Sequence, residues 1–282
     1  MADLLYIFIA SLIFNSILFK LYISISQKYK IYDIPTSLNS HILPTPTGSG
    51  IIILISIIFT MLTMNLLNFH DINSYLPNKY YLFFFCIVCL GIMSFIDDLK
   101  SIPPPIRLII QFTIIFFALP LLEVNDIFFS NIVKLNLITT LYIWVYLINI
   151  INFTDGSDGF LATNSLSFFM GTVAFTIITN NINIIFYISL SFIPILLSYL
   201  YFNKPQAKIF MGDSGSIIIG FSIAFIFFNL IKLGYWDVAL GLLSYTILDC
   251  SLTIFNKIRK GHLPWARLFD YYFLIPIMKD KD

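Results

Sequence analysis

Long apolar runs alternate with short polar segments along the whole chain. A helix that crosses a membrane needs about 20 mostly apolar residues, and nine runs approach that length. The pattern therefore predicts an all-α integral membrane protein, a polytopic helical bundle of about nine transmembrane helices in one domain, residues 1–282. The predicted spans are residues 4–26, 50–67, 80–96, 106–122, 135–151, 161–179, 182–202, 216–233 and 236–255.

The composition agrees with a membrane protein and excludes other classes. Of the 282 residues, 59% are hydrophobic and 11% are charged, whereas soluble proteins carry about 25% charged residues. The charges cluster between the runs, which excludes a soluble protein with a large core. A net charge of +1 predicts no nucleic-acid partner. The first run lacks a basic start and a small-residue cleavage site, so we expect a retained span rather than a signal peptide.

The basic residues predict the orientation of the bundle, because short cytoplasmic connections are enriched in Lys and Arg. With the N-terminus outside and the C-terminus cytoplasmic, twelve basic residues lie on the inner side and three on the outer side. The inner twelve are Lys28, Lys30, Lys100, Arg107, Lys204, Lys208, Lys257, Arg259, Lys260, Arg267, Lys279 and Lys281. This orientation puts five segments in the cytoplasm, namely residues 27–49, 97–105, 152–160, 203–215 and 256–282.

The second cytoplasmic segment begins with two adjacent carboxylates, Asp97 and Asp98, in "FIDDLKSIPPPIR". Adjacent carboxylates repel each other unless a cation is near, and an acidic pair at a helix C-terminus opposes the helix dipole. The pair therefore indicates a functional site. The alternative is a solvated helix end that the three prolines terminate.

The third segment, "NFTDGSDGF", concentrates polar chemistry after a run without charges. Asn152, Asp155 and Asp158 recur every third residue, a spacing that shares one helix face. Gly156 and Gly159 allow the backbone to turn or to approach a ligand closely. The alternative is a pair of Asp-Gly turns before the next helix.

The fourth segment contains "FMGDSGS", in which Asp213 lies among small residues at a predicted helix start. Exposed N–H groups at such a start can bind phosphate, although Asp and Ser are also ordinary N-caps. Phe210 fits either a ring that stacks on a base or a membrane-interface anchor. The first segment, "PTPTGSG", fits either a ligand-binding loop or a helix start. The basic cluster in "NKIRKGHLPWAR" can be explained by membrane topology alone, because basic residues are enriched on the cytoplasmic side.

Five carboxylates on one predicted face indicate Mg²⁺ and phosphate chemistry, because Mg²⁺ prefers carboxylate and phosphate oxygens. They are Asp97, Asp98, Asp155, Asp158 and Asp213. The chain has no His/Cys cluster for zinc and no Walker loop for ATP hydrolysis. An ion transporter is an alternative, but transporter sites usually lie near the bilayer midplane between internal repeats.

Taken together, the motifs resemble those of the polyprenyl-phosphate N-acetylhexosamine-1-phosphate transferases, and most closely the members that initiate O-antigen or use N-acetylglucosamine. "PTPTGSGI", "FIDDLKSIPPPIRLIIQ", "NFTDGSDGF", "FMGDSGS" and "IRKGHLPW" follow the order of the family's motifs. The resemblance implies transfer of a sugar phosphate from a UDP-N-acetyl sugar to undecaprenyl (polyprenyl) phosphate. UMP is released, and an O-antigen-like surface glycan is started. It also implies Mg²⁺ (or Mn²⁺) as cofactor, a bacterial cytoplasmic membrane and, as in many members, a homodimer.

The resemblance also implies roles for the acidic residues. Asp213 becomes the best Mg²⁺ ligand, with Asn152 as a second candidate, and Asp155 belongs to the nucleotide and metal region. Asp97 and Asp98 correspond to the pair that orients or deprotonates the acceptor phosphate. These four carboxylates form the expected catalytic set.

For the donor, the resemblance places Asp158 and Phe210 at the uracil, and Gly156 and Gly159 near the diphosphate, which Arg259 faces. His262 and Arg267 are candidates for the sugar and diphosphate loop. The family's histidine cluster is missing, because residues 270–274 read "DYYFL". We expect an altered sugar choice, and the alternative is an inactive relative that still binds nucleotide sugar or lipid.

Overall fold

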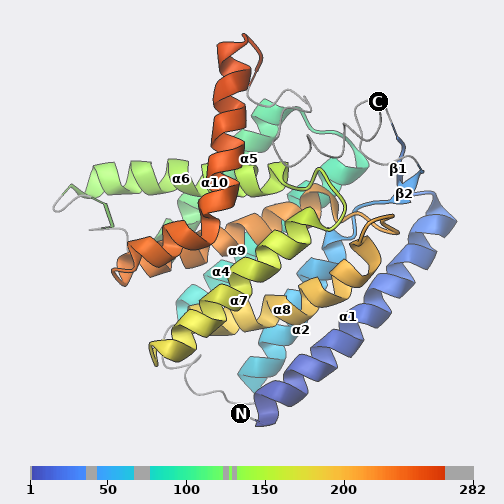
Figure 1. Cartoon of the computed structure of the whole chain (residues 1–282), viewed down its shortest axis with the longest axis horizontal. Coiled ribbons are helices and arrows are strands. Elements are labelled where there is room, and N and C mark those ends of the chain that lie inside the picture. The colour runs from blue at the N-terminus through green and yellow to red at the C-terminus, as the bar shows by residue number, and fades with distance from the viewer. Residues whose placement is uncertain (1, 36–42, 67–76, 123–126, 129–131, 264–282) are drawn as a thin grey trace.

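The computed structural model describes the chain except for residues 1, 36–42, 67–76, 123–126, 129–131 and 264–282, and it is almost entirely helical (Figure 1). Two short strands, β1 (Tyr32–Asp33) and β2 (Thr45–Pro46), form an antiparallel pair. A 3₁₀ turn, η1, spans Leu119–Leu121. The α-helices are α1 (Ala2–Tyr29), α2 (Gly50–Leu66), α4 (Pro77–Leu99), α5 (Pro104–Ala118), α6 (Val133–Phe153), α7 (Phe160–Ile178), α8 (Ile184–Asn203), α9 (Gly212–Lys232) and α10 (Trp236–Arg259).

The helices confirm the predicted fold class. Each predicted span overlaps one α-helix. Within the described part of the chain, eight helices are long and apolar enough to cross a membrane, and the apolar part of α2, Gly50–Met64, is shorter than these eight. The exposed side of α1 is also apolar, as expected for a helix that faces lipid. Its exposed leucines and isoleucines recur every fourth position: Leu5, Ile9, Ile13, Ile17, Leu21 and Ile25.

The helices extend further into the polar segments than the hydropathy pattern predicted. Asp97 and Asp98 lie in the last turn of α4 rather than in a connection. Asn152 is still part of α6, and α9 already begins at Gly212 instead of residue 216. Hydropathy locates the apolar centre of a span, whereas the helical hydrogen bonds continue through polar residues at its ends.

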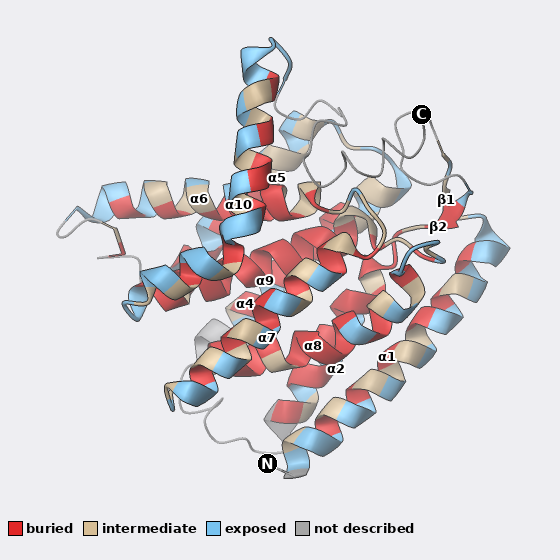
Figure 2. Cartoon of the chain, viewed as in Figure 1, coloured by how far each residue is buried: buried red, intermediate tan, exposed pale blue. Residues whose placement is uncertain are grey.

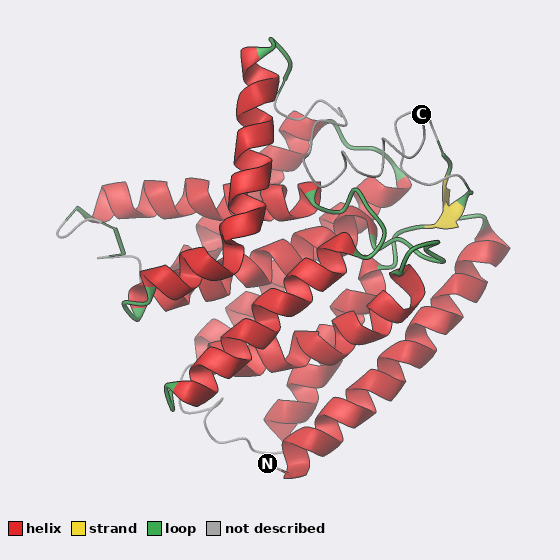
Figure 3. Cartoon of the chain, in the orientation of Figure 1, coloured by secondary structure: helices red, strands yellow, loops and turns green. Residues whose placement is uncertain are grey.

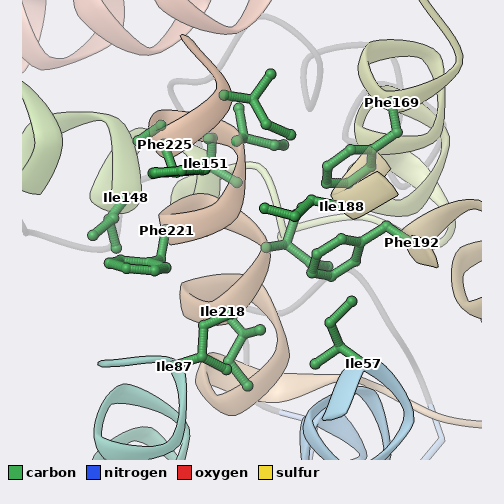
Figure 4. Packing of buried hydrophobic residues seen from close by; sticks show 14 of the residues in the cluster. Ile57, Ile87, Ile148, Ile151, Phe169, Ile188, Phe192, Ile218, Phe221 and Phe225 are labelled. Atoms are coloured by element: carbon green, nitrogen blue, oxygen red, sulfur yellow. The ribbon is translucent and has the colours of Figure 1, made fainter. Parts of the chain in front are cut away.

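Helix α9 is the central helix of the bundle. Of its most apolar 18-residue stretch, 94% is buried, compared with 22% for α1 (Figure 2). It packs chiefly against α4 and α6. The rings of Phe221 and Trp144 stack with centroids 5.2 Å apart, and Figure 4 shows Phe221 beside Ile148 of α6. Because α9 is held on several sides, its first turn is a fixed reference point for the polar segments.

Two glycines allow helices to approach α9 closely. A Cβ atom at Gly220 would lie 3.0 Å from the Cα atom of Ile148 in α6. At Gly50, the first residue of α2, a Cβ atom would lie 1.9 Å from the backbone nitrogen of Gly215. The α2–α9 crossing therefore leaves no room for a side chain at Gly50. Small residues generally allow the backbones of membrane helices to approach each other closely.

We expect Gly50→Ala to destabilise the protein, because the added methyl group would collide with the backbone of α9. Overpacking of this kind costs about 1–3 kcal/mol of the free energy of unfolding. Thermal melting of the detergent-purified protein measures the effect. Gly241→Ala in α10 is the matched control, since a Cβ atom there meets nothing within 4 Å and alanine is the better helix former. Equal melting temperatures for the two variants would contradict the close crossing.

Candidate active site

Polar segments from distant parts of the chain meet at the end of the bundle where α9 begins. Figure 3 shows the loops before α7 and between α8 and α9 lying side by side there. The backbone N–H groups of Ser49 and Gly50 donate to the carbonyl oxygens of Phe210 and Met211, at 3.2 and 2.9 Å. The first and fourth predicted cytoplasmic segments are therefore joined directly. We call this region the polar end.

Asp98 closes the N-terminus of α9. Its Oδ1 accepts a hydrogen bond from the backbone N–H of Asp213 at 2.8 Å, and its Oδ2 accepts one from Ser214 at 3.1 Å. A carboxylate at this position satisfies free N–H groups and complements the helix dipole. Two of the N–H groups that the sequence suggested for phosphate are thus already bonded within the protein.

Gly212 makes the approach of Asp98 possible. Its φ of +70° lies in the left-handed region, which glycine adopts without steric cost. A Cβ atom at Gly212 would also lie 2.6 Å from both carboxylate oxygens of Asp98. Both the left-handed backbone and the close approach of Asp98 therefore require glycine at position 212.

Arg107 connects Asp97 with Asp213. Its Nη1 donates to Asp97 Oδ2 at 2.7 Å and also to Asp213 Oδ2. The other oxygen of Asp97 accepts the backbone N–H of Ile102 at 2.6 Å. One guanidinium nitrogen thus lies between carboxylates from α4 and α9, and Arg107 itself belongs to the first turns of α5.

Asn152 and Asp155 flank the first turns of α9. The hydroxyl of Ser216 donates to Asn152 Oδ1 at 2.7 Å. Asp155 is half-buried. Loss of hydration raises its pKa well above the usual range, and the carboxylates of Asp213, Asp98 and Asp158 raise the pKa further. Four carboxylates therefore share this space, which favours a bound cation.

Asp158 and Gly159 are held by the segment that follows α8. Asp158 Oδ2 accepts the backbone N–H of Ala207 at 3.0 Å. Asn203 Oδ1 accepts the N–H of Gly159 at 2.9 Å, and Asn203 Nδ2 donates to the carbonyl of Ile209 at 2.8 Å. Gly159 has a φ of +72°, whereas Gly156 is an exposed residue of the same turn. Asn203 thus joins the third and fourth polar segments.

Phe210 is fixed through its backbone beside these residues. Its N–H donates to the carbonyl of Pro46 at 2.7 Å, and the hydroxyl of Ser49 donates to its carbonyl at 3.0 Å. Tyr22 of α1 donates to the carbonyl of Thr47 at 2.8 Å. The half-buried ring of Phe210 therefore sits on a rigid segment.

Two candidate residues of the last predicted segment, Arg259 and His262, lie apart from the aspartates of the polar end. Arg259 and His262 are exposed, and the C-terminal half of α10 extends away from the bundle (Figure 1). Among the residues that the structure describes, neither side chain forms a hydrogen bond or ion pair with the aspartates. Arg267 lies outside the described residues.

The described residues fit Mg²⁺ with few protein ligands. They contain no group of three or more His, Cys, Asp or Glu side chains arranged for a metal. Asp97 Oδ2 and Asp213 Oδ2, however, converge on one cationic nitrogen. Mg²⁺ is commonly held by one or two carboxylates, with phosphate and water oxygens as its other ligands. Two converging carboxylates suit such an ion.

Two residues of the polar end were missed by reasoning from the sequence. Arg107 was counted only as a topological charge, although it follows the acidic pair by one short proline turn. Asn203 was not considered, although its place before Lys204-Pro205 marks the end of a helix. Both act through contacts with residues far away in the chain, which no local pattern reports.

A family model described as glycosyl transferase family 4 matches residues 80–231, more than half of the 282 residues. Three similar proteins are each named phospho-N-acetylmuramoyl-pentapeptide-transferase. The protein of Leuconostoc citreum is 40% identical over 97 residues, 33% of this chain and 29% of its own length. That of Prochlorococcus marinus is 32% identical over 198 residues, 62% and 53% of the two chains. That of Staphylococcus carnosus is 29% identical over 253 residues, 80% and 73%. The matches thus cover less than two thirds of the length of the Leuconostoc citreum and Prochlorococcus marinus proteins.

We expect Asp155→Asn to raise the melting temperature in EDTA at pH 7.5. Because the pKa of Asp155 is raised in the folded protein, the folded protein loses stability as the pH rises from the pKa of the unfolded state through that of the folded state. At pH 7.5, well above the ordinary pKa of an aspartate, this cost is present, and asparagine removes it. Asp237→Asn, at an exposed site, is the control. A lower melting temperature for Asp155→Asn would contradict the repulsion between the carboxylates.

We expect Asn203→Ala to loosen both segments that Asn203 joins. Loss of a buried hydrogen bond should raise amide exchange about tenfold in residues 154–160 and 205–211. Asn203→Asp keeps the acceptor for Gly159 but loses the donor to Ile209, so only the second segment should exchange faster. Hydrogen exchange with mass spectrometry distinguishes the two patterns. Unchanged exchange in Asn203→Ala would contradict the linking role.

Proposed function

Since this chain belongs to glycosyl transferase family 4, we propose that it transfers an N-acetylhexosamine 1-phosphate from a UDP-sugar to a polyprenyl phosphate. An oxygen of the lipid phosphate attacks the β-phosphorus of the donor, the bond to the α-phosphate breaks, and UMP leaves. The product is a polyprenyl-diphospho-sugar. The observation that carries the proposal is the convergence of Asp97, Asp213 and Arg107 from three helices at one end of an apolar bundle.

Two polyanionic substrates require positive charge at the polar end. Both substrates carry phosphate, so their approach requires neutralisation of charge. Bound Mg²⁺ would supply positive charge between the phosphates, with Asp213 and Asp97 as its ligands and Asn152 as a further candidate. Arg107 supplies the positive charge that the protein itself brings to these carboxylates.

The donor is proposed to bind along the third and fourth segments. Asp158 is held through one oxygen by Ala207, so that its other oxygen can accept a hydrogen bond from uracil. Phe210 has a fixed backbone and a half-exposed ring for stacking on the base. Gly156 is exposed and leaves space for a diphosphate beside the backbone, whereas Gly159 is buried against Leu200 and shapes the turn. Arg259 and His262 have no role in this proposal, because they lie at the exposed end of α10.

The acidic pair is proposed to position groups rather than to remove a proton. Both oxygens of Asp98 accept backbone N–H groups of α9, and both oxygens of Asp97 are bonded to Ile102 and Arg107. A phosphate monoester is already largely ionised at neutral pH. Attack by the acceptor therefore needs no general base from either aspartate.

The proposed setting is the bacterial cytoplasmic membrane, with the polar end facing the cytoplasm. One substrate then arrives from water while the other remains anchored in lipid. For the sugar, we propose N-acetylglucosamine or a 6-deoxy-N-acetylhexosamine, which would start an O-antigen-like glycan. The names of the similar proteins make the N-acetylmuramoyl-pentapeptide donor the competitor that the assay must include.

We expect purified protein with Mg²⁺, undecaprenyl phosphate and the correct UDP-sugar to release UMP. The panel contains UDP-N-acetylglucosamine, UDP-6-deoxy-N-acetylhexosamines and UDP-N-acetylmuramoyl-pentapeptide. Asp213→Asn should lower the rate about a hundredfold or more, because a preorganised electrostatic group is lost.

The exposed Asp237→Asn is the control with the same chemical change and should keep the wild-type rate. No UMP release with any donor, while a known transferase works in the same assay, would overturn the proposal. Binding of a UDP-sugar without turnover would identify an inactive relative instead. An unchanged rate in Asp213→Asn would remove Asp213 from the metal site.

A further inference from the structure

Arg107 lies where a cation between Asp97 and Asp213 would lie. A single nitrogen, Nη1, bonds to Oδ2 of both aspartates. The remaining oxygen of Asp97 is committed to the backbone of Ile102. An ion that binds both carboxylates must therefore share Asp97 Oδ2, which the guanidinium of Arg107 already holds.

The position is open to ions from water. The side chain of Asp213 is 28% exposed and that of Arg107 is 20% exposed, whereas that of Asp97 is only 7% exposed. An incoming ion would compete with Arg107 for Asp97 Oδ2. Like charges cannot share this space, so the ion and the guanidinium exclude each other.

The side chain of Arg107 can move away from this position more easily than the two carboxylates can. Arg107 is attached to the first turns of α5 by a long flexible side chain, which can move without displacing the helix. Asp97 and Asp213 are fixed at the ends of α4 and α9. The carboxylates therefore stay in place while the guanidinium moves.

We propose that Arg107 occupies the cation position between Asp97 and Asp213 until a divalent ion binds, and that the ion displaces the guanidinium toward a substrate phosphate. Guanidinium groups bind phosphate through paired hydrogen bonds. The inference rests on the proposed function for its second step only, because the exchange of cations needs no substrate. By linkage, metal and phosphate then strengthen each other's binding.

The exchange is tested by binding of Mn²⁺ to detergent-purified protein without substrates, followed by the electron paramagnetic resonance signal of the free ion. Arg107→Gln removes the resident charge, and we expect it to bind Mn²⁺ about tenfold more tightly, since charge-assisted hydrogen bonds no longer compete. Weaker or unchanged binding would overturn the proposal, because Arg107 would then organise the aspartates or play no part.

Two further variants keep the test decisive. Lys100→Gln removes a positive charge from an exposed neighbour and should leave Mn²⁺ affinity within about twofold, as expected for a solvated charge. Arg107→Lys keeps the charge and should bind Mn²⁺ as weakly as the wild type. If Arg107→Lys binds as tightly as Arg107→Gln, competition by charge is wrong. Melting curves confirm that each variant is folded.

The second step is tested by coupling between the metal and two phosphate probes. Mn²⁺ should tighten the binding of farnesyl phosphate or of UDP in the wild type, and the gain should disappear in Arg107→Gln. A gain that disappears only for farnesyl phosphate assigns the freed guanidinium to the acceptor, and one that disappears only for UDP assigns it to the donor. Coupling that persists with both probes would overturn the displacement toward phosphate. Failure of sugar transfer would leave these binding results unaffected.

Discussion

The bond between Asp98 and the first turn of α9 is the contact on which the polar end depends. Helix α9 is the most deeply buried span, and a buried helix start leaves N–H groups that need acceptors. Asp98 supplies two acceptor oxygens from α4, and the left-handed Gly212 lets them approach. The position of Asp213 follows from this contact, because Asp213 is itself one of the two donors. A structural bond thus places the residue that is proposed to hold the metal.

The adjacent aspartates therefore have different tasks even though a sequence motif treats them as a pair. Asp98 faces α9 and is bonded through both oxygens to backbone. One oxygen of Asp97 accepts the N–H of Ile102, in the connection between α4 and α5, and the other is bonded to Arg107 of α5. Consecutive residues of a helix point in directions about 100° apart, which follows from 3.6 residues per turn. The acidic pair can join two neighbouring helices to α4 for this reason.

The sequence was sufficient for the fold class because span length and hydropathy are local properties. It also identified the aspartates and glycines of the polar end, since these interrupt apolar runs with residues that a membrane disfavours. It did not separate Asp97 from Asp98, and it missed Arg107 and Asn203, because their partners are distant in the chain. Charge counting even hid Arg107 among twelve inner basic residues. The relation of the last segment to the aspartates was expected from resemblance alone, and Arg259 and His262 lie exposed and apart from them.

The polar end combines firmly bonded backbone segments with an excess of negative charge. Asn203, Ser49 and Asp98 join segments through neutral or helix-capping bonds that need no ligand. The carboxylates of Asp155, Asp158, Asp98 and Asp213 nevertheless remain close enough to raise the pKa of Asp155. Arg107 balances only part of this negative charge. A protein selected for stability alone would replace several of these aspartates, because sites shaped for function often cost stability. The excess is physically reasonable if cations and phosphates complete the site, and the rigid anchoring then keeps the carboxylates in place while those charges enter and leave.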